Sequence, residues 1–191
     1  MSSIKLDKWK ATSGNVQKTP IIQVVQKVVD QHHGTVYSNS NTVGWESPLS
    51  QSISLHNRDS KVLVCLDFRA GCNYWQLAGT LTRNNQPIDE ATGYNRSRRT
   101  PVTWTDNNYE NVAGTDQYSE YSSYQCNRLM FLDTPTFLDS SNTVSYGFLM
   151  VSYDGNTISM PNPKYGMYDR QNDARYFDSA ICTMTLMEVQ Q

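Results

Sequence analysis

The 191-residue sequence carries little charge: Asp, Glu, Lys and Arg make up 18% of it, and the formal net charge is −2. Without an excess of positive charge the chain lacks the field that holds a polyanion, so nucleic acid is not an expected partner. No apolar run approaches the roughly 18 to 20 residues of a membrane-spanning helix, and the amino end lacks a signal peptide's apolar region. We therefore expect synthesis in a cytosol without export, and no insertion into a membrane.

Cysteine is also scarce, and its four positions follow no metal-binding spacing. Cys65 and Cys182 lie within alternating apolar segments, where a free cysteine behaves as a small hydrophobic residue, so we predict that both are in the core. Cys72 and Cys126 lie in irregular sequence. Whether they form a disulfide stays open, because that bond requires an oxidising environment.

Catalytic signatures are missing as well: G-x-S-x-G, H-E-x-x-H and G-x-x-x-x-G-K-[ST] do not occur. The acidic residues between Asp89 and Glu120 include the two carboxylates that glycoside hydrolysis needs, but they lie in polar, turn-like sequence typical of solvated groups. The adjacent His32 and His33 would point to opposite faces of a strand. We predict no enzyme, no metal and no cofactor, with a glycan-cleaving enzyme as the less favoured alternative.

What the chain has instead is β-branched and aromatic residues in alternating order, clearest in Ser60 to Arg69. One face of this segment is apolar at the period of two that a strand requires: Val62, Val64, Leu66 and Phe68. The middle of the opposite face is also apolar, through Leu63 and Cys65. Such a segment is typical of a strand in a two-sheet sandwich, and we predict that its apolar face is buried together with part of the last strand.

Other segments show the same signals: residues 21–29, 53–55, 74–83, 100–105, 126–133, 144–153, 157–160 and 180–189. Turn-forming residues at 56–60 predict a hairpin between 53–55 and 60–69, and Asp154-Gly155 predicts one between 144–153 and 157–160. The last strand ends close to the terminus, so we expect it inside a sheet. With roughly eight to ten strands and no helix, the sequence predicts an all-β single sandwich, with an eight-stranded jelly roll as the leading architecture.

The first 19 residues are polar, with isolated apolar side chains at Ile4, Leu6 and Trp9. We predict that residues 1–19 form an arm and residues 20–191 the sandwich head. An isolated Trp on a polar segment is the kind of aromatic anchor that dominates interfaces, so these three residues are candidate docking residues. The alternative is a disordered tail.

Tyrosine is abundant in the polar region after the predicted strand at 74–83, among Asn, Asp, Gln and Ser. Tyr offers large, stiff, amphipathic contact area, which suits the binding of a sugar. The candidate ligand-binding residues are Tyr94, Arg96, Arg98, Arg99, Trp104, Tyr109, Tyr118, Tyr121 and Tyr124. The same aromatic residues would equally cover the ends of the sandwich or a subunit interface, and the three arginines would equally form a solvated loop.

Several segments together are similar to a known family. They are K-T-P-I-I-Q-V-V-Q at 18–26, S-I-S-L at 52–55 with S-K-V-L-V at 60–64, M-F-L-D-T-P at 130–135, I-C-T-M-T-L-M-E-V at 181–189, and the leader S-S-I-K-L-D-K-W-K at 2–10. They resemble a domain of tail-fibre-like and virion structural proteins of marine bacteriophages, cyanophages especially. Residues 71–125 are richer in Trp, Tyr and charge than that family, so its surface specificity does not transfer.

The resemblance implies a small jelly-roll-like or tumour-necrosis-factor-like head, often trimeric, displayed on the virion. We therefore expect a virion structural protein whose partners are other virion proteins and two further copies of itself. Two placements stay open: a capsid decoration or short head fibre, and a receptor-binding tail-fibre tip that recognises host surface glycan. We expect the strands at 74–83 or 144–153 to contribute the interface between copies.

Overall fold

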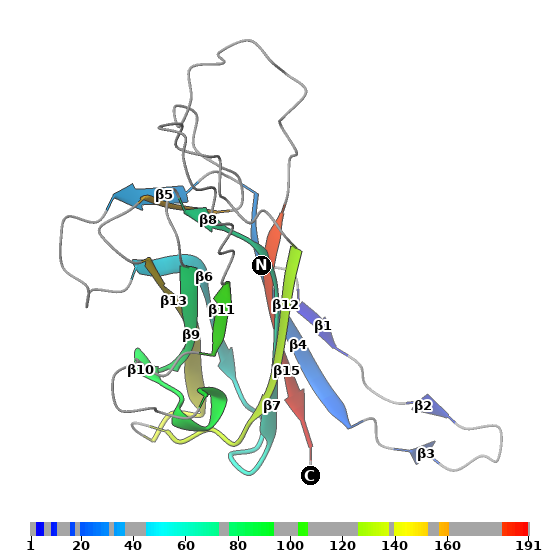
Figure 1. Cartoon of the computed structure of the whole chain (residues 1–191). Coiled ribbons are helices and arrows are strands. Elements are labelled where there is room, and N and C mark those ends of the chain that lie inside the picture. Colours follow the sequence, from blue (N-terminus) through cyan, green and yellow to red (C-terminus); the bar gives the residue numbers. More distant parts are fainter. Residues whose placement is uncertain are drawn as a thin grey trace, which may run out of the picture.

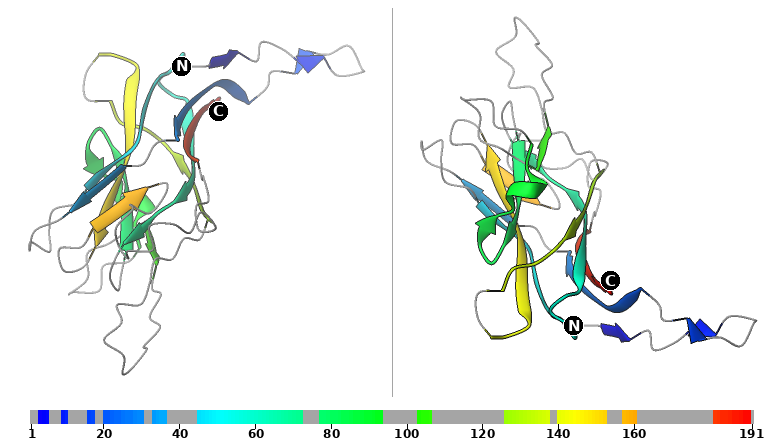
Figure 2. Two further views of the ribbon diagram at one scale, coloured as in Figure 1. Left: turned by 90° about the horizontal axis from the view of Figure 1, so that it is seen from above. Right: turned by 90° about the horizontal axis from the view of Figure 1, so that it is seen from below.

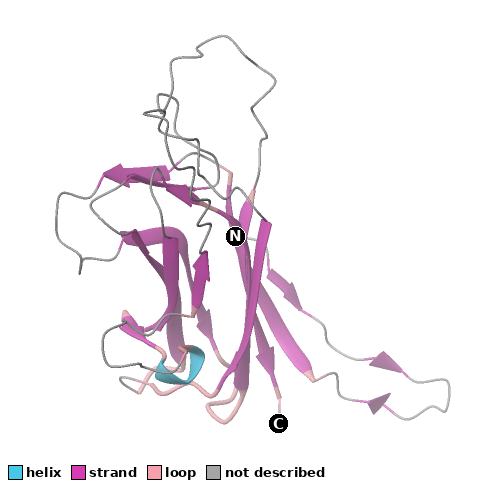
Figure 3. Cartoon of the chain, viewed as in Figure 1, coloured by secondary structure: helices cyan, strands magenta, loops and turns pink. Residues whose placement is uncertain are grey.

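The computed structural model describes the chain in twelve separate stretches. They are residues 3–5, 9–10, 16–17, 20–30, 33–36, 45–72, 77–93, 103–106, 126–137, 140–152, 157–160 and 181–190. Regular structure within them consists of β-strands and one short 3-10 helix, η1 (Asp89–Ala91) (Figure 3). The predicted all-β class is confirmed.

Two antiparallel sheets face each other in the body of the protein (Figure 1). The first sheet contains, side by side, β1 (Ser3–Lys5), β4 (Ile21–Val29), β15 (Cys182–Val189), β7 (Lys61–Arg69) and β12 (Cys126–Asp133). The second sheet contains β6 (Trp45–Ser54), β13 (Thr143–Ser152) and β9 (Leu77–Arg83), with β10 (Gln86–Pro87) and β11 (Trp104–Asp106) both paired to β9. The predicted β-sandwich is confirmed, and the last strand lies inside its sheet as expected.

The order of the long strands is that of a jelly roll. Taken along the chain, β4, β6, β7, β9, β11, β12, β13 and β15 alternate between the two sheets, except that β9 and β11 are neighbours in the second sheet. The first and last of these strands lie side by side, as do the second and the seventh. This nesting of early strands against late ones is the double Greek key of the jelly-roll architecture.

Both predicted hairpins are wrong. The connection after β6 crosses to the facing sheet, so β6 and β7 do not pair. Likewise β13 has β6 on one side and β9 on the other, which leaves no edge for β14 (Thr157–Met160). Instead, β14 pairs with β5 (His33–Val36) and β8 (Gly71–Cys72) in a small sheet across one end of the sandwich (Figure 1). Turn-forming residues indicate that the chain reverses direction, but not whether the next strand joins the same sheet or the facing one.

The turn at Asn84-Asn85 does close a hairpin. Both residues have positive φ, 51° and 64°, and they join Arg83 of β9 to Gln86 of β10. Asn tolerates this left-handed conformation better than most residues, and two such residues in succession are characteristic of the two-residue turn that matches strand twist. The run Asn84-Asn85-Gln86-Pro87 predicts a turn after the strand, and the structure confirms this prediction.

Strand β7 lies in the middle of the core, as its sequence predicts. Its side chains alternate between buried and half-buried, and Val62, Val64 and Leu66 are completely buried. Phe68 meets Phe148 of the second sheet, with ring centroids 4.9 Å apart and the planes tilted by 54°. That packing also explains Gly79, where an added Cβ would overlap the Phe148 ring.

In the neighbouring β15 every second side chain is buried, on the same face of the sheet as the buried residues of β7. These side chains are Cys182, Met184, Leu186 and Glu188. The predicted joint burial of β7 and the last strand is therefore confirmed. Of the two cysteines predicted in the core, Cys182 is buried, whereas Cys65 is half-buried on the outer face of β7. Burial raises the pKa of the Cys65 thiol, with a smaller contribution from the nearby Asp67 carboxylate.

Candidate functional site

Two carboxylates are buried at one end of the sandwich. Asp133 of β12 and Glu188 of β15 are both paired with Val62, from opposite sides of β7. Residues paired across strands share a face of the sheet, and Val62 faces the core, so both acidic side chains point inward. Asp133 is 3% exposed and Glu188 0%. A carboxylate removed from water costs much free energy unless it is hydrogen-bonded or paired, so each needs partners within the protein.

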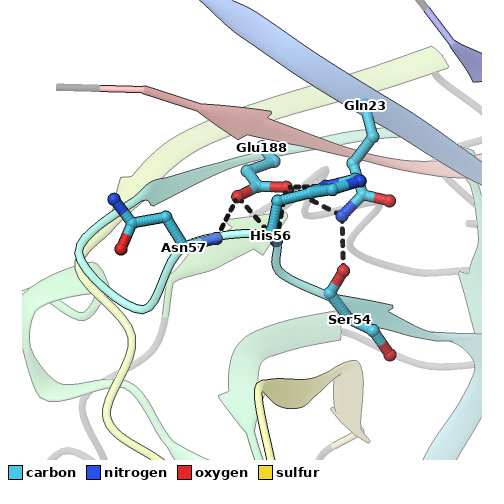
Figure 4. Close-up of polar contacts among 5 residues, drawn as sticks. All are labelled: Gln23, Ser54, His56, Asn57 and Glu188. Carbon is cyan, nitrogen blue, oxygen red and sulfur yellow. Dashed lines mark hydrogen bonds and ion pairs between the residues drawn. The ribbon is translucent and has the colours of Figure 1, made fainter.

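Glu188 receives its partners from the connection between β6 and β7 and from β4 (Figure 4). Its Oε1 accepts hydrogen bonds from the backbone N–H groups of His56 and Asn57, at 3.0 and 3.1 Å. Its Oε2 accepts one from Gln23 Nε2 at 2.8 Å and lies 2.9 Å from His56 Nδ1. Gln23 Nε2 also donates to the carbonyl oxygen of Ser54 at 2.6 Å. Glu188 therefore fixes the segment that crosses from one sheet to the other.

Asp133 makes a second link between the sheets. Its Oδ1 accepts from Arg83 Nη1 and its Oδ2 accepts from the Tyr146 hydroxyl, both at 2.6 Å. Arg83 and Tyr146 are paired residues of β9 and β13, so one carboxylate of the first sheet holds two strands of the second. Burial raises the pKa of Tyr146, and the hydrogen bond to Asp133 raises it further, so the phenol remains a donor.

The four carboxylate oxygens all accept hydrogen bonds from the protein itself. A general acid or base must reach a proton on the substrate, whereas these groups face the core and are already occupied. What this arrangement does chemically is to fasten the sheets together at one end. The sequence carried a signal for Glu188, which continues the buried phase of Cys182, Met184 and Leu186. Asp133 carried no such signal, because the four residues before it are all apolar and do not show which face of β12 is buried.

The Glu188 cluster predicts a specific dependence of stability on pH. Burial by itself raises the pKa of Glu188, but the hydrogen bonds from the His56 side chain and from the His56 and Asn57 amides outweigh it, so the pKa lies below its usual value. A carboxyl whose pKa is lower in the folded state stabilises the fold above its unfolded pKa, about 4.3, and loses that contribution as the pH falls through the folded value. We expect acid to destabilise the protein progressively below about pH 4.3.

The Glu188→Gln variant should be less stable at neutral pH and should lose part of this acid dependence, because its amide does not titrate. Urea unfolding at pH 7, 4.5 and 3 measures both effects. The exposed Glu90→Gln change is the control, since Glu90 lies at the surface in η1. Parallel pH profiles for the parent and Glu188→Gln would show that Glu188 is not the titrating group.

Two of the predicted docking residues, Ile4 and Trp9, lie in strands of a ribbon that leaves the sandwich. Strand β1 pairs with β4 through Ser3 opposite Val25 and Lys5 opposite Gln23. Two further short strands lie between β1 and β4 in the chain, and they pair with each other: β2 (Trp9–Lys10) and β3 (Val16–Gln17). The β2–β3 pair lies well away from the two sheets in every view (Figures 1 and 2). Ile4 is thus placed at the edge of the first sheet and Trp9 far from it, while Leu6 is outside the described residues.

An apolar row crosses the outer face of the first sheet. Leu63 faces outward on β7, and strand pairing aligns it with Leu132 on one side and Met187 on the other. Met187 is in turn aligned with Val24, and Val24 with the position of Ile4. Met130, one step along β12, is 60% exposed, and Leu132 is 49% exposed. We call Val24, Leu63, Met130, Leu132 and Met187 the outer apolar patch.

Most of the predicted ligand-binding residues lie outside the described residues: Tyr94, Arg96, Arg98, Arg99, Tyr109, Tyr118, Tyr121 and Tyr124. Trp104 lies in β11, opposite Gly79 of β9. The Tyr-rich stretch at 107–125 follows Asp106 and precedes Cys126, which are paired with Leu77 and Arg69. These pairs lie at the end of the sandwich opposite the two buried carboxylates. Both described residues that flank the Tyr-rich stretch therefore lie away from the carboxylates.

The described part of the chain contains no group of His, Cys, Asp and Glu side chains able to hold a metal ion. Within the same residues, no helix has the length and apolar character needed to cross a membrane. Neither a family model nor a curated protein matches this chain.

Proposed function

We propose that this protein is a structural protein of a bacteriophage virion, with the jelly-roll head displayed on the particle and the N-terminal ribbon attached to a neighbouring virion protein. Two independent considerations support the proposal. The strand segments and the leader at residues 2–10 resemble virion proteins of marine phages, as set out above. The jelly roll is an architecture that viral coat and appendage proteins often use.

The observation that carries the proposal is the ribbon formed by β1 to β4. A two-stranded ribbon on its own is at best marginally stable in water, because it has no third layer against which to bury side chains. The β2–β3 pair lies away from the sandwich and meets no other described strand. Such an element gains stability from a surface on another protein, for which β2 supplies Trp9 as an aromatic anchor. Ile4 and Leu6 precede Trp9 in the sequence and are the other two candidate anchors.

Deleting residues 1–15 tests the proposal. We expect a folded, soluble head that is no longer incorporated into particles, because most of the ribbon is gone while β4 keeps its pairing with β15. Mass spectrometry of purified virions, from cells that produce the phage with parent or truncated protein, measures incorporation. Trp9→Ala is the matched variant that keeps the whole backbone, and it should reduce incorporation in the same direction. Normal incorporation of the truncated protein would contradict an attachment role for the ribbon.

The second candidate function is a receptor-binding tip that recognises host surface glycan. The observation in its favour is compositional: the stretch between β11 and β12 is rich in Tyr and Asn, and both strands meet it at the same end of the sandwich. A displayed end with stiff aromatic side chains suits sugar binding. A glycan array probed with the purified chain separates this function from a decoration that acts by protein contacts alone, for which we expect no bound glycan.

A further inference from the structure

Strand β12 exposes apolar side chains at the edge of the first sheet. Four consecutive apolar residues, Leu129 to Leu132, occupy its second half. On the outer face Met130 and Leu132 are about half exposed or more, and on the inner face Leu129 and Phe131 are only partly buried against the core. Among the described strands, β12 pairs with β7 alone. Both faces of an edge strand are thus apolar and open.

An open apolar edge is hazardous, because a second chain can add a strand to it. Proteins usually protect such edges with a lysine, a proline or a bulge. None of these interrupts Cys126–Asp133, which pairs with β7 through eight successive positions without a shift. Its two charged residues are both engaged: Arg128 Nε donates to Asp67 Oδ1 at 2.6 Å, and Asp133 is buried. An edge without these protections is expected to be covered in the assembled protein.

We propose that a second copy of this chain covers the edge of β12 and the outer apolar patch. The apolar row crosses the whole first sheet, from the position of Ile4 on β1 to Leu132 on β12. Because the row is apolar along its whole length and reaches the β12 edge, a second copy placed over this face can bury the patch against its own identical patch. The same chain therefore supplies both halves of the contact, with no requirement for a different protein.

The charges around the patch fit a second copy as well. Asp67 and Arg128 lie side by side next to Met130, with side chains 48% and 72% exposed. Because the two opposite charges are paired within each copy, this face has no local excess of charge to repel an identical copy. The formal net charge of −2 adds little repulsion between copies. This inference rests on the proposed function as a virion protein, whose family resemblance implies contact between copies, and it locates that contact on the first sheet, not on β9 or β13.

Sedimentation of the full chain over a range of micromolar concentrations tests the proposal. We expect the parent to self-associate, and the double variant Met130→Lys/Leu132→Lys to weaken association by about tenfold or more, because lysine opposes burial at an interface. Both positions are already about half exposed, so the variant should fold. Circular dichroism and the melting temperature check this. Ser50→Lys, at an exposed position of the second sheet, is the control and should associate like the parent.

Hydrogen exchange on the unaltered chain gives a second test that does not depend on any variant. Amides of residues 128–132 should exchange more slowly at concentrations where the chain is associated than where it is dissociated. A parent that stays monomeric, or a folded lysine variant that associates as tightly as the parent, overturns the proposal. A chain that associates through β12 but is absent from virions keeps this inference and defeats the proposed function.

Discussion

Replacing Phe68 by alanine is expected to destabilise the protein by about 3 to 5 kcal/mol, the usual loss for a large aromatic side chain in a close-packed core. Phe68 is 2% exposed and packs on Phe148 of the facing sheet, so truncation leaves a cavity between the sheets. For a chain of this length the loss corresponds to a fall in melting temperature of about 6 to 20 °C. Thermal and urea unfolding measure it.

Leu63→Ala is the matched control, because Leu63 lies on the same strand but on its outer face, where it is only half-buried. It should cost much less than Phe68→Ala. If the two variants melt alike, or if Phe68→Ala melts like the parent, β7 does not have its inner face in the core.

Replacing Asp133 by alanine should cost a comparable amount, about 3 to 5 kcal/mol, because it leaves a buried guanidinium and a buried phenol without their acceptor. Arg83 and Asp133 side chains are 17% and 4% exposed, so water cannot readily take the place of the lost carboxylate. Since Asp133 joins β12 to β9 and β13, the loss should also speed hydrogen exchange at that end of both sheets. Urea unfolding measures the free energy, and amide exchange locates it.

The chain offers its own control for this experiment. Asp67 and Arg128 form an ion pair at the same N–O distance of 2.6 Å, but both side chains are largely in solvent. Asp67→Ala should therefore change stability far less than Asp133→Ala, because water solvates the charge that remains. Tyr146→Phe, which keeps the Arg83–Asp133 pair, should fall between the two. Equal losses for both aspartates would mean that Asp133 is not held in the buried geometry described.

The two ends of the sandwich differ, and the difference bears on which end of the head faces away from the virion. One end is fastened by Glu188 and Asp133, and the ribbon begins at β4, whose first residues lie at that same end. The Tyr-rich stretch between β11 and β12 joins the sandwich at the other end. Under the proposed function, the fastened end faces the particle and the Tyr-rich end faces outward.

The sequence alone determined the clearest core strands, because burial of one face imposes a period of two on the order of apolar residues. It did not predict the short strands β1, β2, β3 and β8, and it predicted β6 only at residues 53–55. Val62, Val64, Leu66 and Phe68 alternate along β7, and Cys182, Met184 and Leu186 do so along β15. The turn at Asn84-Asn85 was equally local, since it depends on the backbone preference of two adjacent residues. An all-β sandwich follows from such patterns without knowledge of which strands meet.

Only the tertiary structure decided the pairing. Local sequence fixes the face that a strand buries but not its neighbour, so 53–55 and 60–69 gave the signal of a hairpin although β6 and β7 belong to different sheets. The grouping of the candidate site residues also depended on which strands pair. Asp133 and Glu188 are 55 residues apart in the chain and become neighbours only because β7 lies between their strands. The row from Val24 to Leu132 likewise exists only in the register of four strands, since no stretch of sequence contains it.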